Sequence, residues 1–442
     1  MRCYFYTFGC KVNTCETAGL QQLLVDSGYT IADSPEEADI AVINSCTVTS
    51  SGDHRMLSLL RQMKKKNPEL IIVLTGCYVQ AFPEKAGQIK EADLLIGNKD
   101  KAQLPERIRQ FLEKPSSACN TQGISPYKKD DPFELLPCET FAHNTRAFLK
   151  IQDGCNSFCS YCIIPYARGR CRSMPLSALR KQAELLVRAG HREIVLSGIN
   201  LAFYGAEWGG TLLDAAECVS SAGAERIRLG SLEPERMTES LLEGLAGLPG
   251  FCPQFHLSLQ SGCSRTLRAM NRKYTAEEYA DICRRVRQHF PDCAITTDIM
   301  VGFPGETEED FEQSLRFAEK IRFAKMHVFR YSPRPGTPAA GSPEQIPENI
   351  KTERMKRMQA LGAAMQRAHL KSCVGREVLV LFEREKGDGF HTGHAPDGSV
   401  IKIPQQNRKK SLRKSVFCVR IEESDDACCF GQLTEDSFAN PT

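Results

Sequence analysis

Residues 148–162 read FLKIQDGCNSFCSYC, a short strand-like run followed by three closely spaced cysteines. These are Cys155, Cys159 and Cys162, in C-x3-C-x2-C spacing. Three thiolates in one loop can hold a single four-iron cluster. Because one of the four irons then has no protein ligand, it keeps an open position, which marks a site for substrate or cofactor rather than a purely structural site.

A zinc site is the alternative for this loop. Structural zinc takes four protein ligands. Neither a histidine nor a fourth cysteine follows Cys162 at short spacing, and Cys171 is the nearest candidate. We therefore favour the iron–sulfur cluster.

Strands and helices continue to alternate on the C-terminal side of this loop. Helical stretches such as Leu176–Ala189 and Ala276–His289 separate apolar runs typical of buried parallel strands. The predicted strands are Phe148–Gln152, Ile194–Ser197, Ile227–Gly230, Phe255–Gln260, Ala294–Ile299 and Met326–Phe329. Six βα units within residues 145–370 predict a partial barrel, shorter than the eight-stranded β/α barrel.

Residues 1–112 also alternate short apolar runs with amphipathic stretches, which predicts an α/β domain with a parallel sheet. Cys10, Cys46 and Cys77 each follow a predicted strand. The carboxyl ends of parallel strands share one edge of a sheet, where ligands bind, so these thiolates are expected to hold a second four-iron cluster. The alternative is an ordinary buried cysteine, which suffices for Cys3, Cys15, Cys119 and Cys138.

Two further segments complete the chain. Residues 113–144 are rich in Pro, Ser, Lys and Asp without periodicity, and are expected to be a linker. In residues 371–437, short β-like runs with glycine turns predict a small β-barrel. Some basic residues of this barrel are candidates for contacts with nucleic-acid phosphates, with a solvated surface as the alternative. They are Lys402, Arg408, Lys409, Lys410, Arg413 and Lys414.

Composition excludes several classes of protein. The 442 residues include 20 cysteines, and Met1 leads into Cys3 without the apolar region of a signal peptide. No stretch approaches the ~18 apolar residues of a membrane span. We therefore expect a cytoplasmic protein without a membrane partner, in which cysteines bind metal rather than form disulfides. The net charge of +3 identifies no partner, so nucleic-acid binding would depend on local basic patches.

The C-x3-C-x2-C loop after a barrel strand resembles the radical S-adenosylmethionine superfamily, and Ile163–Arg170 resembles its methylthiotransferase branch. Gly9–Asn13, Asn44–Val48 and Thr75–Cys77 resemble the first domain of that branch, and the terminal barrel resembles the RNA-binding TRAM domain. The resemblance implies two 4Fe–4S clusters, and S-adenosylmethionine as radical source and methyl donor. One cluster would cleave this cofactor to a 5′-deoxyadenosyl radical, and the other would deliver sulfur.

Polar residues just beyond the barrel strands are candidates for binding the cofactor, because the carboxyl ends of barrel strands reach the reacting centre. Capping and turn formation are the alternative for each. The candidates are Gly198, Asn200, Ser231, Glu233, Gln260 and Asp298. Thr307 and Asp310 have capping-box spacing, which predicts the start of a helix.

The stretch Gly9–Asn13 with Glu16 and Thr17 resembles the branch that converts N6-threonylcarbamoyladenosine, next to the anticodon of tRNA, to its 2-methylthio derivative. This resemblance implies tRNA as substrate, an electron donor such as a flavodoxin or ferredoxin, and a sulfur source. One alternative is methylthiolation of N6-isopentenyladenosine in tRNA. A second is methylthiolation of an aspartate on a ribosomal protein, against which the basic barrel argues. A non-enzymatic redox-sensing RNA-binding protein is the third, and it leaves the open irons unexplained.

Overall fold

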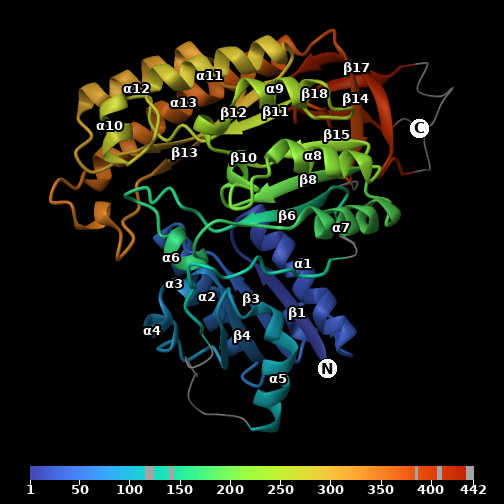
Figure 1. Ribbon diagram of the computed structural model, residues 1–442, viewed down its shortest axis with the longest axis vertical. Coiled ribbons are helices and arrows are strands. Elements are labelled where there is room, and N and C mark those ends of the chain that lie inside the picture. Colours follow the sequence, from blue (N-terminus) through green and yellow to red (C-terminus); the bar gives the residue numbers. More distant parts are fainter. Residues whose placement is uncertain (115–123, 139–143, 384–386, 406–410, 435–442) are drawn as a thin grey trace.

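The computed structural model describes residues 1–114, 124–138, 144–383, 387–405 and 411–434. Figure 1 shows an N-terminal α/β part in blue, a central part from green to orange and a small β-barrel in red. The predicted fold class is confirmed: a parallel α/β sheet, a central partial β/α barrel and a closed terminal barrel. Within the described ranges, no helix is both long and apolar enough to cross a bilayer.

The N-terminal sheet has five parallel strands in the order β2-β1-β3-β4-β5. The strands are β1 (Arg2–Thr7), β2 (Thr30–Ile31), β3 (Ile40–Ser45), β4 (Ile71–Gly76) and β5 (Leu94–Ile96). Helices cover both faces, which is why β3 is buried at every position. The helices are α1 (Lys11–Asp26), α2 (Ser50–Lys66), α3 (Cys77–Ala81), α4 (Pro83–Ala86) and α5 (Leu104–Glu113).

Alternate residues of β3 face opposite layers of helix. Ile40 and Val42 pack in one cluster with residues of α1 and α5. Ala41 and Ile43 pack in a second cluster with residues of α2 and α3. The period of two in a β-strand produces this division, so a single apolar run supplies both halves of the N-terminal core.

The central part is a partial barrel whose strands run in chain order. Six parallel strands contribute, and the two sheets that contain them meet at a bridge between Ile227 and Phe251. The strands are β6 (Ala147–Asp153), β8 (Glu193–Gly198), β9 (Arg226–Leu229), β11 (Gln254–Leu257), β12 (Ala294–Val301) and β13 (Lys325–Arg330). Two short strands flank them, β7 (Arg172–Ser173) and β10 (Ser231–Leu232).

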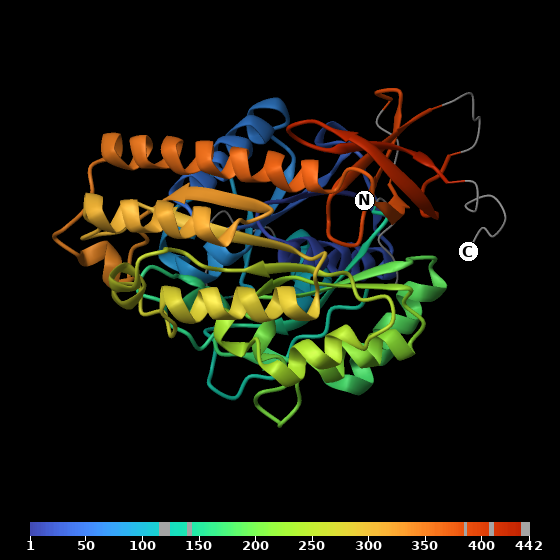
Figure 2. The same cartoon turned by 90° about the horizontal axis from the view of Figure 1, so that it is seen from above.

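Helices cover the outside of the partial barrel, and capping boxes start three of them. Thr307 and Asp310 form one, as their spacing predicts. Figure 2 shows α13 in orange alongside the yellow helices of the outer layer. The larger helices are α7 (Leu176–Arg188), α8 (Leu212–Ser221), α9 (Glu239–Ala246), α11 (Ala276–His289), α12 (Glu308–Ile321) and α13 (Glu348–Ser372).

The terminal barrel closes in the order β14-β15-β16-β18-β17. Its strands are β14 (Glu377–Phe382), β15 (Phe390–His394), β16 (Val400–Pro404), β17 (Val416–Ser424) and β18 (Cys429–Leu433). The sequence pattern indicates three of these runs but not β15 or β18. The β15 sequence FHTGH is polar, although its middle residues are buried, so it lacks the apolar alternation that marks a strand.

Two buried arginines of β9 dock this barrel onto the central part. Arg228 donates to the carbonyl oxygens of Pro396 (2.8 Å) and Ala395 (3.2 Å). Arg226 donates to the carbonyl oxygen of Leu379 (2.9 Å). Glu193 of β8 pairs with both guanidinium groups, so their charge is balanced inside the interface.

Residues 124–138 have no helix or strand but lie against both neighbouring parts. The Ser125 backbone N–H donates to Asp100 (2.9 Å), and the ring of Tyr127 lies 4.6 Å from the guanidinium of Arg172. This stretch of the predicted linker is therefore packed along the junction.

Candidate functional site

Three cysteines meet at the carboxyl edge of the N-terminal sheet, and we call them the N-terminal triplet. Cys10 caps α1, Cys46 follows β3 directly, and Cys77 begins α3 immediately after β4. Burial, together with the neighbouring thiols of Cys77 and Cys10, raises the pKa of Cys46 to about 12. The three thiols therefore lie close enough to oppose one another's ionisation, and a cation or cluster would relieve this repulsion.

Two glycines allow these strand ends to approach closely. Gly76 has φ +103°, and a Cβ there would lie 2.3 Å from the carbonyl oxygen of Ser45. Gly9 has φ +105°, and a Cβ there would lie 2.7 Å from the Cβ of Cys46. Other residues neither adopt these backbone angles readily nor fit the space, so glycine is required at both positions.

The second set, Cys155, Cys159 and Cys162, lies on the loop between β6 and α6 (Ile164–Arg168), and we call it the barrel triplet. Burial, with the neighbouring thiols of Cys159 and Cys155, raises the pKa of Cys162. Phe158 within the loop has φ +45°, and its carbonyl oxygen accepts a hydrogen bond from Asn271 (2.9 Å). The loop is thereby held in a tight, left-handed conformation at this point.

Side chains distant in sequence contact the barrel triplet. Asn200, which follows β8, donates its amide to the sulfur of Cys155 (3.4 Å). Arg272 donates to the sulfur of Cys159 (3.4 Å) and pairs with Glu233. Such hydrogen bonds stabilise thiolate ligands and tune the potential of an iron–sulfur cluster.

The spacing of the six thiols bears on which metal they fit. Zn–S bonds of about 2.3 Å place the sulfurs of a tetrahedral zinc site about 3.8 Å apart. Among the described residues, neither triplet forms a group of ligand atoms within 4.8 Å of one another, with or without Cys171. Sets of three thiols at wider spacing fit a cubane cluster better than a single zinc ion.

A cavity of about 360 Å³ opens beside the barrel triplet, within the usual range for ligand sites. Among the described residues, Gln260 Oε1 and the Tyr331 hydroxyl are buried there without a hydrogen-bond partner. Gln260 has φ +69°, a strained conformation for a non-glycine residue that is enriched at functional sites. The cavity is lined by Val48, Thr49, Tyr161, Cys162, Gln260, Asp298, Met300, Phe329 and Tyr331, among others.

Polar atoms without partners beside apolar walls match S-adenosylmethionine, which carries an amino group, a carboxylate, hydroxyls and an adenine ring. A larger hollow, of about 490 Å³, lies beside the 124–138 stretch and is lined by none of the six cysteines. The smaller cavity is therefore the candidate cofactor site.

The other predicted residues occupy different positions. Gly198 allows the close approach of Gln152, because a Cβ at this glycine would lie 2.9 Å from the Gln152 side chain. Ser231 is exposed on β10. Of the basic residues, Lys402 pairs with Asp388 (2.9 Å), and Lys414 reaches the carbonyl oxygen of Ala189 (3.5 Å). Arg413 lies half-buried in the turn before β17, and Arg408, Lys409 and Lys410 lie outside the described residues.

Sequence reasoning missed a buried charged network between the N-terminal sheet and the barrel. Arg168 is fully buried and donates to Cys77 Sγ (3.3 Å), to Glu16 (2.7 Å) and to Asp153 (3.1 Å). Lys150 pairs with both carboxylates at 3.0 Å, and Lys101 pairs with Glu16. Three cationic side chains thus face two carboxylates, which leaves positive charge beside Cys77 to offset a thiolate ligand. Arg168 lies within the stretch Ile163–Arg170, but nothing in its local pattern reveals its distant partners.

A second contact fixes the Cys46 loop to the barrel rim. Arg334 donates to Asp53 and to Thr47, each at 2.6 Å. The backbone N–H of Ser50 donates to the hydroxyl of Ser332 (3.1 Å). These contacts hold the loop after β3 against the edge of the cavity.

Two family models match the chain. Residues 149–318 match the Radical SAM superfamily, and residues 2–97 match a family described as Uncharacterized protein family UPF0004. Among solved structures, the radical S-adenosylmethionine methyltransferase TsrM from Kitasatospora setae, with tryptophan and a cofactor analog bound, has a TM-score of 0.57. It is 12% identical and covers 77% of this chain and 75% of its own, a likeness in fold alone.

Curated relatives cover most of the chain. The threonylcarbamoyladenosine tRNA methylthiotransferase MtaB of Bacillus subtilis (strain 168) is 39% identical over 386 residues, 86% of this chain and 84% of the relative. MtaB of Aquifex aeolicus (strain VF5) is 37% identical over 87% of this chain and 93% of the relative. The tRNA-2-methylthio-N(6)-dimethylallyladenosine synthase of Wolbachia pipientis wMel is 36% identical over 97% of this chain and 98% of the relative. This identity shows that the chain belongs to the radical S-adenosylmethionine family of tRNA methylthiotransferases.

Proposed function

We propose that this enzyme converts N6-threonylcarbamoyladenosine, next to the anticodon of tRNA, to its 2-methylthio derivative. The cavity beside the barrel triplet carries the proposal, because Val48 and Thr49 line it together with barrel residues. Both belong to the loop that follows Cys46, so the cavity beside the barrel triplet is bordered by the segment that carries a cysteine of the N-terminal triplet. A radical and a sulfur donor must both reach one carbon atom of the substrate, and this arrangement supports that requirement.

Enzymes of this family use S-adenosylmethionine and 4Fe–4S clusters. Bound at the barrel triplet, cofactor and cluster would supply a 5′-deoxyadenosyl radical, and the cofactor also the methyl group. Gln260 and Tyr331 would bind polar groups of the cofactor, and Asp298 lies on the same wall. The apolar side chains of Met300 and Phe329 exclude water from the space where a radical must be protected.

The N-terminal triplet would hold the second cluster, which supplies sulfur. Arg168 supports this role, because its hydrogen bond to Cys77 stabilises a thiolate. An electron donor such as a flavodoxin or ferredoxin and a cellular sulfur source complete the reaction in this proposal.

Lys11 supports the threonylcarbamoyl substrate. It follows Cys10 at the start of α1, and burial lowers the pKa of its ammonium group to about 8. Its electrostatic neighbours include Glu193 and Arg228 of β8 and β9 and His327 of β13. These partners belong to three strands of the partial barrel, which supports a position of the ammonium group near the barrel. The threonylcarbamoyl group ends in a carboxylate, which a lysine binds, whereas an isopentenyl group is apolar.

The terminal barrel is the proposed tRNA-binding surface. Lys402, Arg413 and Lys414 lie on the barrel or in its turns, and the remaining residues of the proposed basic cluster are Arg408, Lys409 and Lys410. Phosphate contacts from such a cluster weaken as salt is added. The tRNA substrate also supports a location in the cytoplasm.

Mass spectrometry of nucleosides in tRNA from cells with and without the gene tests the substrate. We expect one 2-methylthio nucleoside, the threonylcarbamoyl one, to disappear. Loss of the isopentenyl product instead would assign the enzyme to the other tRNA substrate, and unchanged tRNA nucleosides would contradict a role in tRNA. In vitro, the rate of methylthiolation should be higher for an anticodon stem-loop that carries N6-threonylcarbamoyladenosine than for one that carries N6-isopentenyladenosine.

A further inference from the structure

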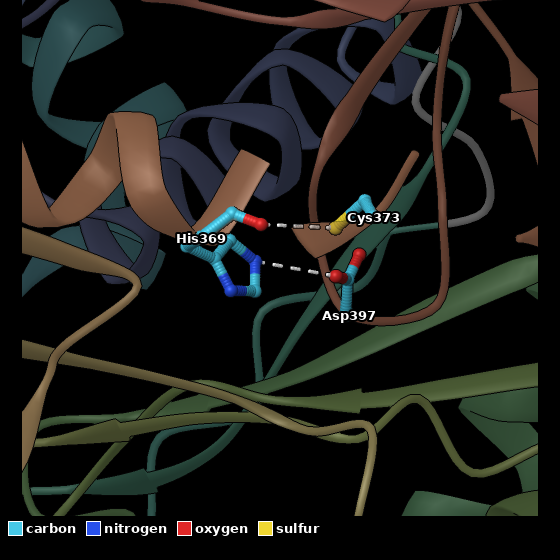
Figure 3. Close-up of side chains that lie close together, drawn as sticks. All are labelled: His369, Cys373 and Asp397. Atoms are coloured by element: carbon cyan, nitrogen blue, oxygen red, sulfur yellow. Dashed lines mark hydrogen bonds and ion pairs between the residues drawn. The ribbon is translucent and has the colours of Figure 1, made fainter. Parts of the chain in front are cut away.

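The seam between α13 and the terminal β-barrel carries a group of metal-binding side chains away from both triplets. His369 lies in the last turn of α13, and Cys373 follows four positions later at its end, so both lie on one face of the helix. Asp397 belongs to the turn between β15 and β16. Figure 3 shows the three side chains close together, with helix on one side and barrel loop on the other.

The ligand atoms are close enough to share one ion. One nitrogen of His369, the sulfur of Cys373 and one oxygen of Asp397 all lie within 4.8 Å of one another. His369 Nε2 is 3.4 Å from Asp397 Oδ2, and Cys373 Sγ is 3.4 Å from the carbonyl oxygen of His369. In the part of the chain that the structure describes, this is the sole group of three or more such side chains with this spacing.

A fourth donor lies next to Cys373. Cys429 begins β18, and its thiol donates to the carbonyl oxygen of Leu370 (3.6 Å) and is an electrostatic neighbour of the Cys373 thiol. It lies outside the group of three within 4.8 Å, so it would turn toward the ion to complete the set. Both cysteines are buried, at 2% and 0% exposure. The four donors come from three separate segments that meet only in the folded chain.

We propose that His369, Cys373, Asp397 and Cys429 bind a zinc ion. Imidazole, thiolate and carboxylate are the side-chain ligands of zinc, and two thiolates disfavour magnesium and calcium. Four protein ligands leave no open position, so the site is structural rather than catalytic.

The surroundings support the ligand positions. The Ser399 backbone N–H donates to Asp397 Oδ1 and its hydroxyl to Oδ2, both at 2.9 Å. Such contacts orient a ligating carboxylate. A small cavity of about 70 Å³ borders His369 and Asp397, which provides a path for the ion.

The ion would fasten the end of α13 to one turn and one strand of the barrel. Since α13 packs against β13 and α12, this connection would fix the barrel relative to the central part. The site goes beyond the proposed function and does not depend on it, because it shares no residue with either triplet or with the cofactor cavity.

Metal analysis of the full chain, with both clusters reconstituted under anaerobic conditions, tests the site. After equilibration with zinc and removal of loosely bound metal, we expect about one zinc per chain in addition to the iron. The zinc X-ray absorption edge, which is separate from that of iron, should show two sulfur ligands, one imidazole and one carboxylate oxygen. No retained zinc, or fewer than two sulfur ligands, would overturn the proposal.

Variants locate the zinc. Cys373→Ser and Asp397→Asn should each lose it while the iron content stays unchanged. Cys418→Ser, which removes a thiol from β17 of the same barrel, should keep it, and so should Cys10→Ser, which excludes binding at the N-terminal triplet. Zinc retained by both Cys373→Ser and Asp397→Asn would place it elsewhere and overturn the assignment. Iron content and methylthiolation report separately on the proposed function.

Discussion

At the scale of single residues, Arg168 connects the two cysteine sites. Its guanidinium group contacts Cys77 and Glu16 from the N-terminal part and Asp153 from the end of β6. The side chain has no exposure to solvent. Loss of any of its hydrogen bonds would leave the partner group buried and unpaired, which destabilises the fold. A buried charge without its partner is costlier than the intact pair is stabilising.

Replacing this arginine should therefore destabilise the enzyme. We expect Arg168→Met to lower the free energy of unfolding by about 3–5 kcal/mol, because Glu16 and Asp153 lose a shared cation. Urea unfolding measures the change. Arg180→Met is the matched control: Arg180 forms an exposed pair with Glu184, and its loss should cost at most about 1 kcal/mol. Equal losses in the two variants would contradict the role of the buried network.

Lys11 is the second residue whose replacement is informative. We expect Lys11→Gln to lower kcat/KM for stem-loops carrying N6-threonylcarbamoyladenosine by about 10- to 100-fold, because one charge-assisted hydrogen bond contributes about 1.5–3 kcal/mol. Lys11→Arg, which keeps the charge, should retain most of the activity. Equal activity of the Gln and Arg variants would show that the cation does not bind the substrate carboxylate.

At the scale of elements, the ends of three parallel strands decide where the N-terminal thiols lie. The strands β1, β3 and β4 run in register, and each delivers its cysteine at or just beyond its carboxyl end. Gly76 sits at the last position of β4, where any side chain would meet the backbone of β3. The geometry of the triplet thus depends on the glycines as much as on the cysteines.

Gly76→Ala should remove the cluster of the N-terminal triplet and leave the cluster of the barrel triplet in place. The added Cβ would lie 2.3 Å from a backbone oxygen, so β3 and β4 must move apart. We expect the iron content after reconstitution to fall from about eight to about four, while cleavage of S-adenosylmethionine is retained. Gly28→Ala is the control, because Gly28 also has a positive φ (+87°) but an added Cβ there would meet nothing within 4 Å. Its backbone strain costs about 1–2 kcal/mol and should leave the iron unchanged.

At the scale of the whole molecule, residues from both the N-terminal part and the partial barrel line the cavity beside the barrel triplet. Arg334 from the barrel rim holds Asp53 and Thr47, and Arg168 joins the two parts at the other side. A cluster on the N-terminal triplet would face one on the barrel triplet only when the N-terminal sheet and the partial barrel are docked. The position of the cavity is a property of the junction, not of either part alone.

The six cysteines should divide into two functional classes. Replacing any member of the barrel triplet with Ala should abolish reductive cleavage of S-adenosylmethionine, because no cluster remains to deliver the electron. Replacing any member of the N-terminal triplet should leave cleavage intact but stop methylthiolation. Chromatographic detection of 5′-deoxyadenosine and of the modified nucleoside measures the two steps separately.

Two results would contradict this division. Cleavage that persists without the barrel triplet would remove those cysteines from the reaction, and normal methylthiolation without the N-terminal triplet would exclude sulfur transfer from it. The wild-type chain should also bind about eight irons, since each cubane holds four. Replacing the buried Cys283, which lies on α11 within the central core, is the control and should change neither step.

The sequence by itself determined the fold class and the candidate cluster ligands. Periodicity and strand-end position are local properties, so the sequence alone is enough to recognise them. Examples are the apolar run Ala294–Ile299 and the spacing of Cys155, Cys159 and Cys162. The fold class and the family are confirmed, whereas the six ligand assignments and the domain limits stay predictions. The capping box of Thr307 and Asp310 was equally local, and the structure contains it.

Only the tertiary structure decided which side chains surround those cysteines. Arg272 and Cys159 are 113 positions apart, and Arg168 and Cys77 are 91 apart. The packing of separate segments also brings Val48 to the cavity. It likewise brings Cys429 next to Cys373. Contacts of this kind depend on how whole sheets and helices dock, and no local pattern records that docking, because a hydrogen bond between residues so far apart in sequence leaves no periodicity in the chain.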